Sequence, residues 1–205
     1  NKILVGFSGG ADSTAAIYFL KKEGYEPVAL HLKLFRESKD FGLREKAEKL
    51  GAEFVEKDVS GDFQNKVVDH FTEEYAGCRT PNPCVKCNPE IKFKYLIEVA
   101  DSMGIQKVAT GHYAKVSKTG GCFRLRKSRD GKKDQSYFLY RLKQEQLARI
   151  KFPLGDRIKS RNKVLLRRGG FDFDEAESQD VCFFSKGESL EDFLGAYSLK
   201  ANKPG

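Results

Sequence analysis

Short apolar runs alternate with amphipathic stretches along the N-terminal half of the chain. Ile3 to Val5 form a continuous apolar run, typical of a short buried strand, and residues 13–22 place apolar side chains at helical spacing. Further strands are predicted at 28–35, 52–59 and 107–110, and further helices at 42–50, 62–74 and 91–103. Because strands alternate with helices, the pattern predicts an α/β fold built on a parallel sheet.

The character of the chain changes after Ala114. The pattern predicts a hairpin at 116–128, a helix at 139–151, a small apolar strand at 181–184 and a last short helix at 189–197. Cationic side chains are frequent throughout this part. We therefore predict two domains, a nucleotide-binding domain at 1–115 and a smaller, basic, mostly helical domain at 116–205.

Composition narrows the function classes. A 40% apolar share indicates a folded protein, and no apolar run approaches the length needed to span a bilayer. The first strand begins at once, so we expect no signal peptide, no membrane partner and a cytoplasmic protein. The net charge of +8 favours a polyanionic partner such as a nucleic acid. In such a chain the five cysteines are expected to be free, metal-binding or catalytic rather than disulfide-bonded.

The glycine-rich turn after the first strand has the geometry of an anion site. A strand, a glycine turn and a helix together aim free backbone amides and the positive helix end at a phosphate. Asp12 suits such a cradle only if a divalent cation, here Mg²⁺, bridges it to the phosphates. The turn has no lysine and is not the common P-loop. The residues of this segment that suit such a site are Ser8, Gly9, Gly10, Asp12 and Ser13.

Two further positions belong to the same predicted edge of the sheet. In parallel α/β sheets the ligand lies at the carboxyl ends of the strands. Leu32 lies near the end of the second predicted strand, and Gly111 follows the strand at 107–110. Gly111 would let a nucleotide approach the backbone, while His112 fits a core or turn position as well as a site position.

A stiff, proline-punctuated loop presents Cys84 and Cys87 ahead of the helix at 91–103. Its prolines are expected to exclude regular helix before Ile91. The helix N-terminus and nearby Lys86 are expected to favour the thiolate form. Three chemistries compete: a zinc knuckle, which lacks a second ligand pair, a redox pair, and a convergence of these thiols with distant Cys182 on the nucleotide site.

A strongly basic stretch runs from Arg124 to Lys133. One interpretation is a solvated loop, and the other is a clamp on a phosphate backbone, with Gln135 and Tyr137 available for contact or stacking. Beside a nucleotide site we favour the clamp.

Six motifs occur in a fixed order along the chain. They are SGGADS at 8–13, RTPNPCVKCNPEIKF at 79–93, ATGHY at 109–113, KDQSYFL at 133–139, FPLG at 152–155 and SQDVCF at 178–183. The first resembles the PP-loop of the N-type ATP pyrophosphatases. The whole order resembles the tRNA-specific 2-thiouridylase (MnmA) family, over nearly the whole chain. The resemblance implies a Rossmann-like domain of the adenine nucleotide α-hydrolase type.

The resemblance also implies a reaction. ATP binds the loop from Gly6 and Phe7 to Ser13, with Leu32 near the adenine and Gly111 at the next strand end. The C2 oxygen of a flipped-out wobble uridine of tRNA attacks the α-phosphate. A persulfide on Cys182 then delivers sulfur, and Cys87 resolves it by forming a disulfide. Residues that match base-contacting or tRNA-contacting positions of the family are Asn82, Pro83, Cys84, Lys133, Asp134 and Gln135.

The chain departs from the family at Cys84, where many members carry an aspartate. Cys84, Cys87 and Cys182 would together suit three irons of a 4Fe-4S cluster, so the cluster and the persulfide route both stay open. The sulfur donor would be a persulfide carrier or hydrosulfide. The family usually continues into a β-barrel, whereas this sequence ends at Gly205. The alternatives are a PP-loop sulfurtransferase acting on another tRNA base or a small molecule, and an RNA-binding paralogue without catalysis.

Overall fold

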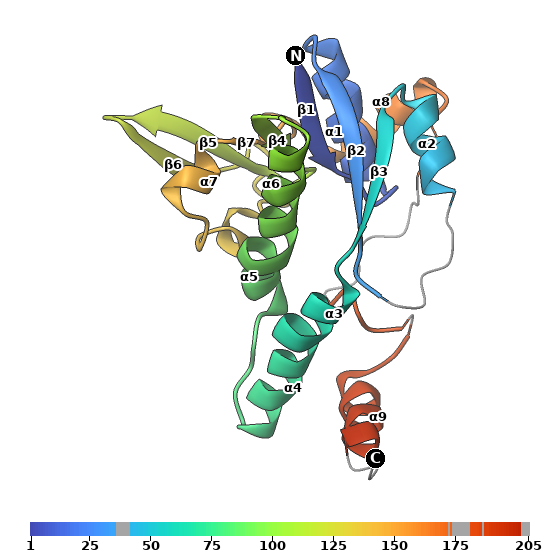
Figure 1. Cartoon of the computed structure of the whole chain (residues 1–205), viewed down its shortest axis with the longest axis vertical. Coiled ribbons are helices and arrows are strands. Elements are labelled where there is room, and N and C mark those ends of the chain that lie inside the picture. The colour runs from blue at the N-terminus through green and yellow to red at the C-terminus, as the bar shows by residue number, and fades with distance from the viewer. Residues whose placement is uncertain (36–41, 172, 174–180, 186, 202–205) are drawn as a thin grey trace.

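The computed structural model of the chain describes residues 1–35, 42–171, 173, 181–185 and 187–201. Its main sheet has five parallel strands in the order β3-β2-β1-β4-β7 (Figure 1). The strands are β1 (Lys2–Gly6), β2 (Glu26–Lys33), β3 (Glu53–Asp58), β4 (Lys107–Ala109) and β7 (Ile150–Lys151). The predicted α/β fold is confirmed, and the sequence predicts all of these strands except β7.

Helices cover both faces of the sheet because successive residues of the buried strands point to opposite sides. Ile3 and Val5 of β1 pack with α1 (Ala11–Lys22) and α2 (Leu43–Lys49). Leu4, between them, packs on the other face with α6 (Phe93–Ser102). The continuous apolar run that predicts a buried strand is therefore explained by a strand covered on both sides.

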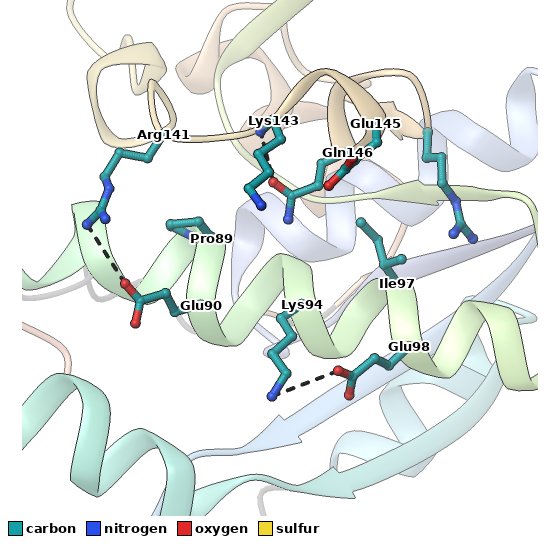
Figure 2. A pocket seen from close by; sticks show the side chains of 10 residues that line it. Pro89, Glu90, Lys94, Ile97, Glu98, Arg141, Lys143, Glu145 and Gln146 are labelled. Atoms are coloured by element: carbon teal, nitrogen blue, oxygen red, sulfur yellow. Dashed lines mark hydrogen bonds and ion pairs between the residues drawn. The ribbon is translucent and has the colours of Figure 1, made fainter.

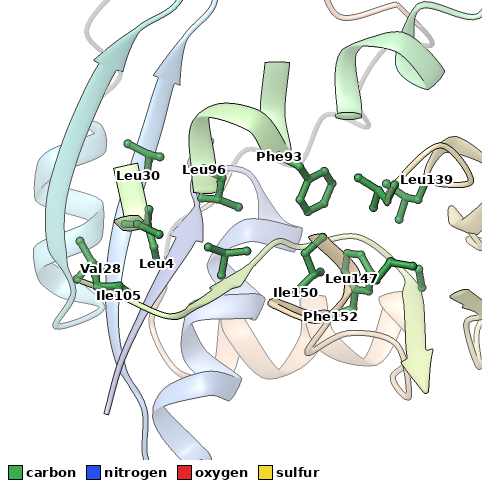
Figure 3. Close-up of a cluster of buried hydrophobic side chains, with 14 residues drawn as sticks. Leu4, Val28, Leu30, Phe93, Leu96, Ile105, Leu139, Leu147, Ile150 and Phe152 are labelled. Atoms are coloured by element: carbon green, nitrogen blue, oxygen red, sulfur yellow. The ribbon is translucent and has the colours of Figure 1, made fainter. Parts of the chain in front are cut away.

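The core on the α6 face extends well beyond the sheet. Figure 3 shows Leu4, Val28 and Leu30 of the strands at one end of this cluster and Leu139 at the other, with Phe93 and Leu96 between them. Leu147, Ile150 and Phe152 belong to the same cluster. Residues beyond the predicted boundary at 115/116 thus pack directly against the nucleotide-binding sheet, and the division into two domains stays a prediction.

The predicted hairpin is formed by β5 (Ala114–Thr119) and β6 (Cys122–Lys127), which project from the side of the main sheet (Figure 1). Val116 lies opposite Leu125, and both pack against the α6-face core. On the other face Lys115 lies opposite Arg126. The hairpin therefore has one apolar, anchored face and one basic face.

Several helical segments below the sheet differ from the predictions. The expected helix at 62–74 is a continuous run of α3 (Ser60–Phe63), the π-helical turn η1 (Gln64–Val68) and α4 (Asp69–Ala76). The predicted absence of helix before Ile91 is wrong, because α5 (Pro83–Cys87) and the π-helical turn η2 (Asn88–Lys92) lead directly into α6. Pro83 occupies the first turn, where a helix needs no donor from its nitrogen, so it begins the helix rather than preventing it.

Two more expectations fail in the C-terminal part. The predicted helix at 139–151 is only α7 (Gln144–Leu147), preceded by the 3₁₀ turn η3 (Ser136–Phe138) and followed by strand β7. The residues expected to form a strand at 181–184 form a turn instead. The basic segment after residue 158 is helix α8 (Lys159–Arg168), and the last predicted helix is α9 (Leu190–Ala201).

The strand order places a topological switch point between β1 and β4. From β1 the chain proceeds through β2 to β3 on one side, and later through β4 to β7 on the other. In open parallel sheets ligands bind where the strand order reverses, at the carboxyl ends of the strands. Here those ends lead into the loop after Gly6 and the loop after Ala109.

Candidate functional site

The loop between β1 and α1 is a compact turn held by its own polar groups. The hydroxyl of Ser13 donates to the carbonyl of Gly10 at 3.0 Å and accepts from the backbone amide of Ser8 at 3.3 Å. Gly9 has a φ of +75°, which favours glycine. Gly10 caps α1 without a side chain, so the first-turn amides point to the switch point uncovered by a capping group.

The Phe7 side chain belongs to the core beneath this loop rather than to the site. Phe7 is 3% exposed and packs in the α1-face cluster. Leu32 is half-buried at the end of β2 and packs against the core on the α6 face. Their contribution to nucleotide binding stays a prediction, as does that of the loop glycines and serines.

Asp12 is held between two partners from distant parts of the chain. Its Oδ2 lies 2.9 Å from the ammonium nitrogen of Lys159, and its Oδ1 accepts a hydrogen bond of 3.2 Å from the hydroxyl of Tyr113. Asn162 donates to that same hydroxyl at 3.0 Å. Burial, together with the charge of Asp12, raises the pKa of Tyr113 above its usual value, so the hydroxyl stays a donor. Helix α8 therefore adds a cation to a loop that has none of its own.

Gly111 permits close contact between the loop after β4 and the start of α1. A Cβ atom at this position would lie 2.7 Å from the carbonyl carbon and oxygen of Asp12 and 2.9 Å from the amide nitrogen of Ser13. We predicted that the glycine would admit the nucleotide to the backbone. The structure shows that Gly111 lets the backbone at the start of α1 come close. Its contact with a nucleotide stays a prediction.

His112 is half-buried and packs against residues of the core. Its ring stacks on Phe93 at 6.0 Å between centroids, and its Nδ1 lies 2.8 Å from the hydroxyl of Thr110. Burial, assisted by the charge of Lys92, lowers its pKa from 6.5 to about 3. The lowered pKa keeps the imidazole neutral at physiological pH. Its packing suits a structural position, and a role in the site stays untested.

The thiols of Cys84 and Cys87 lie on helix α5. Its N-cap is Asn82, whose Oδ1 accepts from the amides of Cys84 at 3.2 Å and Val85 at 3.4 Å. Cys84 is half-buried, whereas Cys87 is 4% exposed and packs among the apolar side chains of α3, η1 and η2. Asn82 and Pro83, predicted to meet an RNA base, therefore also set where the helix begins.

Aromatic packing holds Cys182 near these thiols. The ring of its neighbour Phe183 makes edge contacts with Phe63 at 6.1 Å and with Phe71 at 5.1 Å. Phe183 also packs against the cluster that contains Cys87. Cys182 itself is exposed. The convergence of Cys182 with the thiols of α5, which the spacing alone left open, fits this arrangement best of the three chemistries.

Lys92 is a cation that acts on the thiols of both Cys87 and Cys182. Burial raises the pKa of Cys87 to about 12, Lys92 acts to lower it, and Cys182 and Cys84 add to the rise. Surrounding protein also raises the pKa of Cys182, again opposed by Lys92. The expectation of a depressed thiol pKa is thus wrong for Cys87, because the thiol is buried. Lys86, which was expected to help, lies 4.0 Å from Glu90 instead.

The thiols do not fit a metal cluster as they are placed. Among the described residues, no three His, Cys, Asp or Glu side chains gather closely enough to hold a metal ion. Asp12 does offer the carboxylate oxygens that Mg²⁺ prefers, although one of them faces Lys159.

In the segment predicted to contact tRNA, residues 133–135, two side chains accept hydrogen bonds from other residues of the fold. Asp134 accepts from the amide of Ser128 and the hydroxyl of Ser136, each at 2.7 Å. Gln135 accepts from the amide of Tyr113 at 3.0 Å. Lys133 is half-buried in the same loop. These side chains organise the loop, and their contact with RNA stays a prediction.

A groove of about 500 Å³ lies outside this site, between α6 and the segment around α7 (Figure 2). Its charged side chains pair across it and along α6, as between Arg141 and Glu90 at 3.8 Å and between Lys94 and Glu98 at 3.8 Å. It contains none of the predicted site residues. Its mixed charge gives no preference for an anion, so we do not assign it to the site.

A family model described as the tRNA methyl transferase HUP domain matches residues 1–186. The chain belongs to this family. The match covers both the loop after β1 and Cys182, and it agrees with the Rossmann-like nucleotide-binding fold expected from the sequence.

Curated relatives of this HUP-domain chain include proteins named as tRNA-specific 2-thiouridylases. "tRNA-specific 2-thiouridylase MnmA" of Methylobacillus flagellatus is 39% identical, over 98% of this chain and 58% of the relative. The protein named "tRNA-specific 2-thiouridylase MnmA" from Syntrophomonas wolfei is 46% identical, over 89% of this chain and 55% of the relative. "tRNA-specific 2-thiouridylase MnmA 3" of Bacteroides fragilis is 43% identical, over 94% of this chain and 53% of the relative. The chain spans just over half the length of these relatives.

A solved structure described as a predicted subunit of tRNA methyltransferase from Methanocaldococcus jannaschii aligns with a TM-score of 0.43 at 24% identity. It covers 58% of this chain and 59% of that one. Within the described part of the chain, no helix combines the length and apolarity needed to cross a bilayer.

Sequence reasoning missed Lys159, Lys92, Tyr113 and Asn162 as members of the site. The sequence did draw attention to Lys159, because this residue begins the second basic segment just after the FPLG motif. The indication for Lys92 was weaker: it is a charged residue inside a mainly apolar helical stretch. Neither signal indicates which partner the side chain meets.

Proposed function

We propose that this chain is the catalytic core of an ATP-dependent tRNA uridine 2-sulfurtransferase. Family membership and the names of the relatives support the substrate class and the reaction. The observation that carries the proposal is that the turn with Cys182 packs, through Phe183, against the cluster that contains Cys87 of α5, and that the charge of Lys92 acts on both thiols. Because the proposed substrate is tRNA, we place the reaction in the cytoplasm.

In the first step ATP lies in the loop at Gly6 to Ser13, with its phosphates toward the first-turn amides of α1. The C2 oxygen of the uridine attacks the α-phosphorus, the bond to the β-phosphate oxygen breaks, and pyrophosphate leaves. Lys159 reaches this loop and would stabilise the negative charge that develops on the phosphates. Asp12 would hold Mg²⁺, which neutralises phosphate charge when bound. The C2 oxygen now leaves readily, as AMP.

In the second step sulfur replaces that oxygen. The terminal sulfur of a persulfide on Cys182 attacks C2, and AMP departs with the former C2 oxygen. The Cys87 thiolate then attacks the sulfur of Cys182, which breaks the S–S bond and leaves the electron pair on the sulfur attached to C2. A disulfide between Cys87 and Cys182 results. An external thiol must reduce it, and a persulfide carrier must reload Cys182.

The buried state of Cys87 suits its proposed role as the second thiol to react. A protonated thiol does not attack the persulfide before RNA is present. Lys92, the cation that lowers the pKa of Cys87 and Cys182, is the group that would stabilise the thiolate when it forms. Exposed Cys182 is accessible to a sulfur donor.

The direct test is nucleoside analysis of an unmodified tRNA transcript after incubation with the protein, ATP, Mg²⁺ and a persulfide donor. We expect 2-thiouridine, with its loss in Cys87→Ser and Cys182→Ser and its retention in Cys122→Ser. Cys122 is an exposed strand cysteine and serves as the matched control. Thiolation of another base would support the first alternative, and RNA binding without any thiolation would support the inactive paralogue.

The cluster route predicts a different pattern. Anaerobic reconstitution with iron and sulfide, followed by iron counting, would then yield a cluster whose loss in Cys84→Ala abolishes thiolation from hydrosulfide. The persulfide route predicts that Cys84→Ala keeps its activity and that a disulfide between Cys87 and Cys182 accumulates when reductant is withheld. The placement of the thiols favours the persulfide route.

A further inference from the structure

The two most exposed aromatic side chains of the described residues lie three positions apart. Tyr140 is 68% exposed and Tyr137 is 56% exposed. A tyrosine ring combines an apolar face with a polar hydroxyl, so an exposed pair of them offers a surface suited to flat, partly polar partners. Both lie in the segment that follows Asp134 and Gln135, whose own side chains face inward to hydrogen bonds within the fold.

Local geometry puts both rings on one side of the segment. Successive turns close through hydrogen bonds from Leu139 to the Ser136 carbonyl at 3.0 Å and from Leu142 to the Leu139 carbonyl at 3.0 Å. In such 3₁₀-type turns side chains three apart lie above one another. Leu139 and Leu142 form the buried row, at 1% and 7% exposure, and Tyr137 and Tyr140 form the outward row.

The segment that carries Tyr137 and Tyr140 is anchored to the core. The ring of Tyr137 lies against that of Phe138, at 3.8 Å between centroids, and Phe138 packs against the core on the α6 face. The side-chain amide nitrogen of Asn88 donates both to the carbonyl of Phe138 at 3.3 Å and to that of Cys84 at 2.9 Å. The aromatic segment and the thiol-bearing helix are therefore joined through one buried side chain.

The surroundings favour a polyanion as the partner. The segment packs against α5 on one side and against β6 on the other. β6 carries exposed Arg124, Arg126 and Lys127, and exposed Arg141 follows Tyr140 directly. Among the described residues Arg141 forms an ion pair with Glu90 at 3.8 Å, a loose, partly exposed pair that contributes little and leaves the guanidinium able to meet a phosphate.

We propose that Tyr137 and Tyr140 form a stacking platform for unpaired RNA bases that flank the base reacting at the thiols. The inference rests on the proposed function for the identity of the partner. Aromatic rings bind single-stranded RNA by stacking on bases, which is tolerant of sequence, while the neighbouring cations bind its phosphates. The platform would thus hold the tRNA loop beside α5, and Tyr137 and Tyr140 are positioning residues rather than catalytic ones.

The test measures binding of a labelled anticodon stem–loop RNA to the full chain. We expect Tyr137→Leu and Tyr140→Leu each to weaken binding about tenfold, with little loss in Tyr137→Phe and Tyr140→Phe. The slope of affinity against salt should stay unchanged in the tyrosine variants and decrease in Arg141→Ala, because only the arginine releases counterions. Val164→Ala, at another exposed apolar position on α8, is the matched control and should bind as the unaltered chain does.

A second measurement reports stacking directly. The chain has no tryptophan, so Tyr140→Trp introduces a single indole. We expect its fluorescence to be quenched by the loop RNA and not by a duplex of the same sequence. Unchanged affinity in the Tyr137→Leu/Tyr140→Leu double variant, or no quenching, overturns the platform. If RNA binding depends on the tyrosines but no uridine is thiolated, the platform stands and the proposed function fails.

Discussion

The ammonium nitrogen of Lys159 lies 2.9 Å from Oδ2 of Asp12, although the two residues are 147 positions apart in the sequence. The Lys159 side chain is 17% exposed and that of Asp12 is 30% exposed, so the pair is sheltered at the mouth of the loop. Because the loop itself carries no lysine, we regard Lys159 as its phosphate-directed cation.

Replacing Lys159 with methionine should weaken ATP binding about 10- to 100-fold, the effect of removing a hydrogen bond to a charged group. Equilibrium binding of a nonhydrolysable ATP analogue measures this. Lys115→Met is the matched control, since Lys115 lies at the same 2.9 Å from Asp156 in a more exposed pair that does not include Asp12. Equal affinities in the two variants would remove Lys159 from the nucleotide site.

Gly111→Ala should destabilise the fold and impair nucleotide binding together. The added methyl group would lie 2.7 Å from backbone atoms of Asp12, which cannot move without displacing the start of α1. Overpacking of this kind typically costs about 1–3 kcal/mol, to be measured by urea unfolding. Gly131→Ala, where a Cβ meets nothing within 4 Å, should change stability by less than about 0.5 kcal/mol. Identical unfolding of the two variants would refute this packing argument.

Cys87 should be the slowest of the described cysteines to react with iodoacetamide at neutral pH. Its pKa of about 12, against 9.0 for an ordinary thiol, leaves almost no thiolate there, so the reaction rate should keep rising well above pH 9. Lys92→Met should slow it further. Peptide mass mapping over a pH series provides the rates, with exposed Cys122 as internal reference. A rate that levels off near pH 7 would contradict the assignment.

The same shift affects stability in alkali. The folded state holds the Cys87 proton more tightly than the unfolded chain does, so this contribution to stability is present below about pH 9 and is lost as the pH rises toward 12.

Acid should destabilise the fold through His112. Its pKa is about 3 when folded and 6.5 in the unfolded chain, so its contribution is complete above pH 6.5 and is lost as the pH falls toward 3. The slope of the unfolding free energy from this group is at most about 1.4 kcal/mol per pH unit. Chemical denaturation over that range should give a flatter pH profile for His112→Gln than for His70→Gln, a half-exposed control. Parallel profiles would argue against a neutral buried imidazole.

The parts of the fold that the sequence predicts are those with a dense local signal. The run from Ile3 to Val5 and the apolar stripe of α1 predict buried elements, because each signal lies in a few residues that are close together in the sequence. β7 has only two residues, and its pairing with β4 depends on a long-range contact that no local period encodes. The run at 181–184 has strand-like composition, but its rings pack onto Phe71 and the chain turns there.

Site residues divide in the same way. The glycine turn and the cysteine pair are visible because their chemistry is concentrated in a few adjacent positions. Pro83 was interpreted as a helix breaker, because its place at the first turn depends on the Asn82 cap. The reactivity of Cys87 was misjudged because burial by side chains from α3 and η1 has no signature in its own loop. Lys159 meets Asp12 only through the docking of α8 on α1.

The account depends most on the claim that ATP activates the C2 oxygen of uridine. An RNA whose uridines carry ¹⁸O at C2 tests it directly, by mass analysis of the nucleotide released in the presence of ATP and the persulfide donor. We predict AMP with ¹⁸O in its phosphate, in amounts that match the 2-thiouridine formed. Unlabelled AMP, or ADP in its place, would mean that water or the β–γ bond is involved instead, and would contradict the account.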